Sequence, residues 1–254
     1  MSPVKRKKNP ASYLHRDYRH QFAREGNVVS QVLVRETDLA IVAEKDLTEP
    51  ATHLVIQYRS QLENYLRQHP LFLTSLFPLP QDLTAPPVVR EMLAAGQAAG
   101  VGPMAAVAGV IAEYVGRELL RTQGLTEIVV ENGGDLYLKM TGDATIAIFA
   151  GESPLSNRVG LKIPHSFMPL GVCTSSATVG HSLSFGQADA VTVLAAATGL
   201  ADAVATRICN EVKRESDVET ALNLASQIPG ILGVVIVMGE NLGAWGAVEL
   251  VELT

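Results

Sequence analysis

The chain is poor in cysteine, in long apolar runs and in excess positive charge, and each scarcity excludes a class of protein. Two cysteines, Cys173 and Cys209, lie far apart in 254 residues and form no CxxC pair. A zinc site made by cysteines alone is therefore excluded, and a reducing compartment fits. The longest apolar run, near residues 230–239, is too short to span a bilayer. The net charge of −6 argues against a general nucleic-acid binder, which needs a broad basic surface.

The amino terminus also lacks a recognisable export signal, because no charged stretch is followed there by an apolar region. We therefore expect a soluble, cytoplasmic protein with no membrane and no nucleic acid among its partners. The exception to the acidic balance is the cluster Lys5, Arg6, Lys7 and Lys8. A solvated tail is favoured over an anion-binding arm for this cluster. We expect residues 1–26 to form a basic N-terminal segment and residues 27–254 to form a single domain.

What the chain does contain is typical of a globular protein: 47% apolar and 18% charged residues. Alternating patterns predict two strands that join near Glu36 and Thr37, then a helix with Thr48 as its N-cap and Pro50 in its first turn. Further helices are predicted over 87–99, 103–122, 200–213 and 216–226. Strands are predicted over 127–131, 136–140, 145–149 and 159–163, and in "PLGVCTSS", "DAVTVLAA", "GVVIVMG" and "AVELVEL". Strand blocks that alternate with helix pairs indicate an α+β layered fold.

The predicted helix over 103–122 has an unusual first half. "GPMAAVAG" is built from small residues, which allow another backbone to approach very closely. Glu113, Arg117 and Arg121 follow at four-residue spacing and are expected on an outer, solvated stripe.

The stretch "VVENGGDLYL" at 129–138 has two interpretations. Asn132, Gly133 and Gly134 tolerate positive φ, so the stretch predicts a two-residue hairpin turn between strands. The same glycines leave backbone N–H groups unshielded, so a phosphate can approach them closely. The residues themselves favour the turn but leave the second interpretation open.

The helix around "ADAVATRICN" carries an unusual polar stripe. Asp202, Thr206 and Asn210 recur at four-residue spacing and therefore lie on one face. A carboxylate and a hydroxyl suit a hard cation such as Mg²⁺, which prefers oxygen ligands. In the alternative interpretation, Asp202 lies in the first turn and complements the dipole of its own helix, and Thr206 bonds back to a carbonyl one turn earlier.

A third polar stretch, "CTSSATVGH", follows an apolar strand. The hydroxyls of Thr174, Ser175, Ser176 and Thr178 could hold phosphate oxygens, with His181 nearby as a donor or proton carrier. Alternatively, these hydroxyls satisfy their own backbone. No GxSxG motif surrounds the serines, which disfavours a hydrolase triad.

Together, "GPMAAVAG", "ENGGD", "CTSS", His181, "AVTV" and "ADAVAT" resemble in order and interval the motifs of the ApbE family, the FAD:protein FMN transferases. The resemblance covers about residues 100–212. It implies an ApbE-like layered fold with antiparallel-rich sheets and helix pairs. It also implies that the three polar stretches converge on one cleft that holds Mg²⁺ and FAD. The metal ligands implied are Asp202 and Thr206, and the cofactor-binding residues are Asn132, Gly133, Gly134, Asp135, Thr174, Ser175 and Ser176.

The chain departs from the family pattern in two places, which makes it similar to an uncharacterised ApbE-like branch. Ala108 stands before Gly109 where the family has a lysine, and the family's Asp-Pro-x-Thr-Gly after the histidine is absent. Asp189 is the nearest replacement for that missing aspartate, so His181 and Asp189 are the expected catalytic residues. The resemblance implies an FMN transferase or an enzyme that cleaves a nucleotide pyrophosphate, with a small-molecule nucleotide and an acceptor protein as partners. The alternative is a non-catalytic flavin-binding module or an interaction scaffold.

Overall fold

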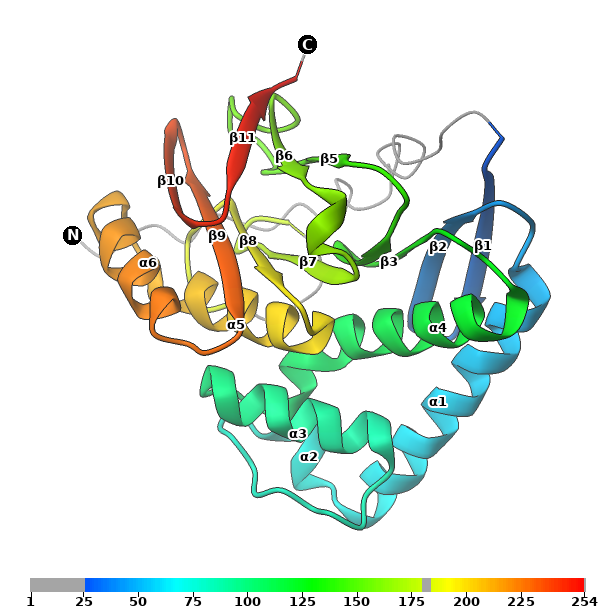
Figure 1. Cartoon of the computed structure of the whole chain (residues 1–254). Coiled ribbons are helices and arrows are strands. Elements are labelled where there is room, and N and C mark those ends of the chain that lie inside the picture. Colours follow the sequence, from blue (N-terminus) through cyan, green and yellow to red (C-terminus); the bar gives the residue numbers. More distant parts are fainter. Residues whose placement is uncertain (1–25, 180–183, 254) are drawn as a thin grey trace.

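The computed structural model describes residues 26–179 and 184–253, in which two antiparallel sheets are stacked and helices cover the larger one (Figure 1). The predicted basic segment 1–26 lies outside the described residues, apart from Gly26. In spatial order, the large sheet contains β1 (Val28–Val34), β2 (Thr37–Ala43), β3 (Ile128–Asn132), β4 (Asp135–Lys139), β7 (Leu170–Ser175), β8 (Ala190–Ala195), β9 (Ile231–Met238) and β10 (Asn241–Gly246). The small sheet contains β11 (Glu249–Glu252), β6 (Val159–Ile163) and β5 (Ala144–Ala147).

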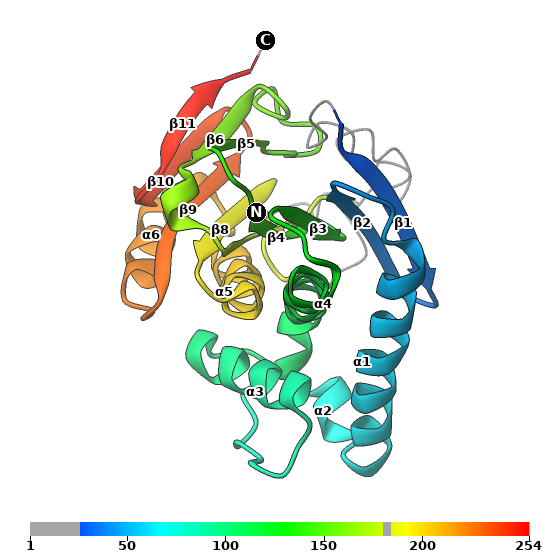
Figure 2. The same cartoon turned by 45° about the vertical axis from the view of Figure 1, so that its right-hand side comes forward.

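Every pairing between these strands is antiparallel, which confirms the predicted α+β fold with antiparallel-rich sheets. The helices lie on the face of the large sheet opposite the small sheet (Figures 1 and 2). They are α1 (Thr48–Gln68), α2 (Leu71–Thr74), α3 (Pro87–Ala99), α4 (Val107–Gln123), α5 (Thr198–Glu211) and α6 (Val218–Ser226).

Apolar side chains fill the spaces between these layers. One cluster joins α3, α4 and α5 to the strands β7 to β9, and a second fills the space between the two sheets. A third packs α1 and α4 against β1 to β4. Because both faces of the central strands are covered, β8 is buried along its whole length and reads as a continuous apolar run.

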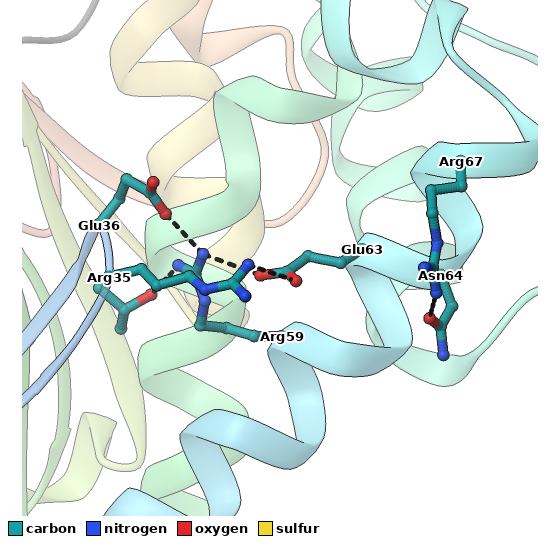
Figure 3. Close-up of polar contacts among 7 residues, drawn as sticks. Arg35, Glu36, Arg59, Glu63, Asn64 and Arg67 are labelled. Atoms are coloured by element: carbon teal, nitrogen blue, oxygen red, sulfur yellow. Dashed lines mark hydrogen bonds and ion pairs between the residues drawn. The ribbon is translucent and has the colours of Figure 1, made fainter.

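Two arginines, Arg35 and Arg59, form polar contacts between the β1–β2 hairpin and α1 (Figure 3). Arg59 donates to the Thr37 hydroxyl at 2.8 Å and pairs with Glu36 at 2.5 Å and with Glu63 at 3.0 Å. Arg35 reaches the same Glu63 carboxylate at 2.8 Å. Glu36 is largely exposed, so its ion pair contributes little, and the partly buried Arg59 adds its bond to Thr37 to the apolar packing of α1 against this hairpin.

The structure differs from the predicted secondary structure at a 3₁₀ turn, at one strand and at one N-cap. The helix predicted over 103–122 begins with a 3₁₀ turn, η3 (Pro103–Ala106), before α4. Strand β10 was not predicted. Thr48 is the first residue of α1 rather than its N-cap, and its N–H donates to Asp46 at 2.9 Å.

Among the described residues, no single helix has the length and apolar composition needed to cross a membrane. The bent pair Pro87–Ala99 and Pro103–Gln123, at 105°, passes by length and composition only.

Candidate functional site

The "NGGD" stretch forms a tight hairpin turn. Asn132 ends β3 and pairs with Asp135 at the start of β4. Gly133 and Gly134 have φ of 68° and 106°, which a two-residue turn needs and which other residues rarely adopt. The N–H of Gly134 donates to Glu131 at 2.9 Å. The turn interpretation is therefore correct, and one of its glycine N–H groups is already bonded to a buried carboxylate.

This turn is bonded to the beginning of α4 at a single peptide group. The Asn132 amide donates to the carbonyl of Ala108 at 3.0 Å. The N–H of the same peptide group belongs to Gly109 and donates to the Asp202 carboxylate at 2.8 Å. The "ENGGD" and "ADAVAT" motifs therefore meet on opposite sides of the peptide that joins Ala108 to Gly109.

The close crossing of α4 and α5 depends on Gly109. A Cβ atom at this position would lie 2.5 Å from the Thr198 carbonyl oxygen and 2.9 Å from the Asp202 Cβ. These are closer than real Cβ contacts, so a side chain here would push the helices apart. Gly109, the last residue of "GPMAAVAG", permits this approach, in agreement with the close backbone contact predicted for that stretch.

The two helices bind each other's N-terminal N–H groups reciprocally. Asp202 of α5 accepts from Gly109 in the first turn of α4, and Glu113 of α4 accepts from the N–H of Thr198, the first residue of α5, at 2.7 Å. Asp202 lies in the second turn of α5, so the prediction that it complements its own helix dipole is wrong, and the terminus that it serves belongs to α4. Glu113 is 9% exposed, so its predicted place on a solvated stripe is also wrong.

Asp135 and Asp202 are buried carboxylates that interact electrostatically. They are 8% and 9% exposed. Burial raises the pKa of Asp202 to about 7, and the N–H groups of Gly109 and Ala108 oppose that rise. Burial also raises the pKa of Asp135 well above its ordinary value, and the nearby Asp202 charge raises it further. The structure thus holds two acids, from two separate motifs, in one place where their ionised forms repel each other.

Two residues of β7 adjoin this acid pair. Cys173 pairs with Asp135 across β4 and β7, and its thiol donates to the Thr198 carbonyl at 3.4 Å. Burial raises the pKa of Cys173 well above its ordinary value, and the charge of Asp135 adds to the effect. A neutral thiol is a poor nucleophile. The next residue, Thr174, shares a hydrogen bond with Thr192 at 2.9 Å and presents its backbone N–H to Asp135.

The remainder of the "CTSSATVGH" stretch turns back on itself. The Ser176 hydroxyl accepts from the N–H groups of Thr178 at 3.0 Å and Val179 at 2.9 Å. The Thr178 hydroxyl donates to Asp189 at 3.3 Å. For Ser176, the alternative in which a hydroxyl satisfies its own backbone therefore holds, while Ser175 is half-buried at the end of β7.

Of the two expected catalytic residues, only Asp189 lies in the part of the chain that the structure describes, and it bonds there to Thr178 and to the β9–β10 turn. Asp189 is 1% exposed, and its carboxylate accepts from the N–H of Gly239, in the turn between β9 and β10, at 2.7 Å. This bond attaches the Thr178 turn to the β9–β10 turn. His181 lies outside the described residues.

Thr206 lies one helical turn beyond Asp202 and is half-buried. The hydroxyls of Thr52 and Thr122 bond back to a carbonyl one turn earlier, at 2.6 and 2.8 Å. No such bond from Thr206 occurs in the part of the chain that the structure describes, so its own backbone does not engage its hydroxyl.

The structure therefore brings together Asn132, Asp135, Thr174 and Asp202, with the turn glycines beside them. Sequence reasoning missed Glu113 as a partner of this region. The signal was weak, because a glutamate at four-residue spacing from two arginines is typical of a solvated helix face. Within residues 26–179 and 184–253, no group of three or more His, Cys, Asp or Glu side chains is arranged to hold a metal ion alone.

Comparison with known proteins shows a family to which the chain is similar over most of its length. The model described as AbpE bacteria matches residues 19–240. The UPF0280 protein of Methanocaldococcus jannaschii is 41% identical over 229 residues, which cover 87% of this chain and 92% of that protein. The UPF0280 protein of Methanosphaerula palustris is 43% identical over 216 residues, 84% of this chain and 89% of that protein.

Two solved structures share the fold. The apo form of the flavinyl transferase ApbE of Pseudomonas stutzeri aligns with a TM-score of 0.54 at 14% identity, over 86% of this chain and 94% of that chain. A mutant of the flavin transferase ApbE of Vibrio cholerae aligns with a TM-score of 0.56 at 15% identity, over 87% and 97%. At these identities the likeness concerns the fold.

Proposed function

Because the chain belongs to the family described as AbpE bacteria, we propose that it binds a flavin nucleotide together with a divalent cation beside β4, β7 and α5. The observation that carries this proposal is the meeting of Asp135 and Asp202. Both are buried, burial raises the pKa of each, and the charge of Asp202 raises the pKa of Asp135 further. A purely structural pair of this kind destabilises the fold, whereas a cation between the carboxylates offsets their repulsion.

The donor set fits Mg²⁺ in particular. The carboxylates of Asp135 and Asp202 and the hydroxyl of Thr206 offer oxygen atoms from neighbouring elements. With no third acidic, histidine or cysteine ligand among the described residues, the protein alone leaves the coordination incomplete. Mg²⁺ commonly keeps several waters and takes phosphate oxygens as ligands. A site in which the phosphates of the nucleotide complete the coordination of the cation therefore explains this small number of protein ligands best.

The nucleotide is proposed to be FAD or FMN, with its phosphates near the turn of Gly133 and Gly134. Support comes from the fold shared with flavin transferases. The two glycines also lack side chains that would keep a phosphate away from the backbone of the turn. Ser175, at the end of β7, adds a hydroxyl on the same side of the sheet as Asp135, whereas the Thr174 side chain lies on the opposite face and Thr174 reaches Asp135 through its backbone N–H.

In the catalytic form of the proposal, an acceptor hydroxyl attacks the FMN phosphorus of FAD. A new phosphoester bond forms, the pyrophosphate P–O–P bond breaks, AMP leaves and the hydroxyl gives up its proton. The cation supplies charge stabilisation on the phosphate oxygens when bound. His181 and Asp189 remain the predicted catalytic residues, with His181 as the donor or proton carrier.

A non-catalytic flavin-binding module is the second candidate, and Ala108 favours it. The family's lysine is missing at this position, and the adjoining peptide is bonded by the protein's own Asn132 and Asp202. Position 108 therefore provides no cationic side chain to stabilise the phosphate group during transfer.

The two candidates separate on incubation of the protein with FAD and Mg²⁺, followed by chromatography for FMN and AMP. Appearance of both products supports the enzyme, and tight binding without products supports the module. Absence of binding of either flavin nucleotide, with Mg²⁺ present, contradicts both. Thr206→Val should weaken Mg²⁺-dependent binding, whereas Thr122→Val, on the exposed side of α4, is the matched control and should not.

A further inference from the structure

Asn210 is the third residue of the polar stripe on α5, and the proposed site uses only the other two residues of that stripe. The side-chain oxygen of Asn210 accepts from the N–H of Phe185 at 2.8 Å and from the Ser184 hydroxyl at 3.5 Å. Both donors belong to residues 184–188, which precede β8 and which we call the α5-bound segment. Asn210 therefore joins α5 to a segment that lies about 25 residues earlier in the chain.

The α5-bound segment lies along the end of α5, with its first residues nearest Thr206. At the helix end, the N–H of Gln187 donates to the Val212 carbonyl at 2.8 Å. Two residues nearer the start of the helix, the N–H of Phe185 meets the Asn210 side chain. Because helical side chains tilt towards the N-terminus of their helix, the Asn210 amide leans over the turn that carries Thr206, about 5–6 Å away between Cβ atoms.

Gly186 makes the contact between this segment and the helix very close. A Cβ atom at this position would lie 1.7 Å from the Cys209 carbonyl oxygen and 3.1 Å from the Val212 carbonyl oxygen. A residue with a side chain could not approach the helix in this way. The Lys213 ammonium also donates to the Phe185 carbonyl. The position of the segment therefore follows that of α5.

The other end of the α5-bound segment reaches the "CTSSATV" stretch. The carbonyl of Ala188 accepts from the N–H of Ala177 at 3.0 Å. Ala177 lies two residues after Ser175, which ends β7 and belongs to the proposed nucleotide site. The segment thus connects the two elements that supply this site, α5 with Thr206 and the end of β7 with Ser175.

The bonds of Asn210 are not explained by the capping of its own helix. The last carbonyls of a helix need donors, and the Val212 carbonyl already has one in the N–H of Gln187. In both of its bonds to the segment, Asn210 is the acceptor. We propose that Asn210 is a positioning residue that acts through the α5-bound segment and fixes the end of β7 relative to Thr206. This role rests on the proposed flavin-nucleotide function.

FAD affinity, measured together with stability, tests this role. Asn210→Ala removes the acceptor and should weaken Mg²⁺-dependent FAD binding roughly fivefold, the equilibrium effect of about one net hydrogen bond. Asn210→Asp keeps an oxygen acceptor and should bind FAD within about twofold of the wild type. Ser30→Ala is the matched control, because the buried Ser30 hydroxyl on β1 accepts from the Leu47 N–H at 2.8 Å. It should lower Tm but leave the FAD affinity unchanged.

Hydrogen exchange follows the segment itself in the absence of any ligand. The amides of residues 185–187 should exchange roughly fivefold faster in Asn210→Ala than in the wild type, and at the wild-type rate in Asn210→Asp. Equal exchange or equal FAD affinity in the wild type and Asn210→Ala overturns the positioning role, as does an Asn210→Asp variant that binds as weakly as Asn210→Ala. These results leave the proposed function standing. A wild type that binds no flavin nucleotide with Mg²⁺ contradicts the proposed function, and the positioning role fails with it even where exchange is faster in Asn210→Ala.

Discussion

Replacement of Glu113 tests the reciprocal contact between α4 and α5. Ala197, the N-cap of α5, provides no side-chain bond to that helix, so the buried Glu113 carboxylate, 2.7 Å from the Thr198 N–H, serves as its cap. A hydrogen bond to a charged group contributes about 1.5–3 kcal/mol, and an unpaired buried donor costs about 1–3 kcal/mol. Glu113→Ala should therefore lower the free energy of unfolding by about 2–3 kcal/mol. Glu113→Gln keeps an acceptor but loses the charge, and should lower it by about 1 kcal/mol.

Urea unfolding followed by circular dichroism measures both values, with an unchanged m-value as evidence that only stability has changed. Arg117, which pairs with Glu113 at 3.3 Å, is 65% exposed, so Arg117→Ala should cost less than about 0.5 kcal/mol. Glu118→Gln, on the same helix, is a further control, because Glu118 is half-buried and pairs with the exposed Arg121. If Glu113→Ala stays within about 0.5 kcal/mol of wild type, or if Arg117→Ala costs as much, the capping role is refuted.

Two further predictions concern neighbouring residues. Gly109→Ala places a Cβ 2.5 Å from the Thr198 carbonyl oxygen, so it should lower stability by about 2–3 kcal/mol and weaken flavin binding; an unchanged Tm contradicts the close crossing. Burial raises the pKa of Glu91, and the charge of Glu113 raises it further. Because the folded pKa lies above the unfolded one, wild-type stability falls as pH rises through the interval between them. Glu91→Gln should therefore be more stable than wild type at pH 7 and equal to it below about pH 4, as measured by Tm across pH; a pH-independent difference contradicts this.

The fold could be predicted to a large extent because its signals are local. Helix α3 and strand β6 begin and end where the sequence patterns predict. The glycines of the "NGGD" turn indicate the β3–β4 hairpin. Strand β10 could not be predicted, because apolar and polar residues alternate only weakly in "NLGAWG" and two of its residues are glycines.

The site could be predicted only in part because its contacts are not local. The sequence indicated Asn132, Asp135 and Asp202 as special but could not show that two of them bond to one peptide of α4. Capping rules look for a polar residue just before a helix, whereas Asp202 and Glu113 each cap the helix that the other belongs to. That arrangement arises from the crossing of α4 and α5 in space, and the spacing of residues along the sequence does not reveal this crossing.

A double-mutant cycle between Asp135 and Asp202 on flavin affinity tests the central claim most directly. FAD fluorescence would be titrated with wild type, Asp135→Asn, Asp202→Asn and the double variant, each with Mg²⁺ and with EDTA. Asp217→Asn, which replaces a half-buried acid at the start of α6, away from the acid pair, serves as the control. A shared cation predicts at least tenfold weaker binding in either single variant, little further loss in the double variant, and no difference among the four proteins of the cycle with EDTA. Equal affinity with Mg²⁺ and with EDTA in the wild type, or additive losses that persist in EDTA, would contradict a cation held between these two carboxylates.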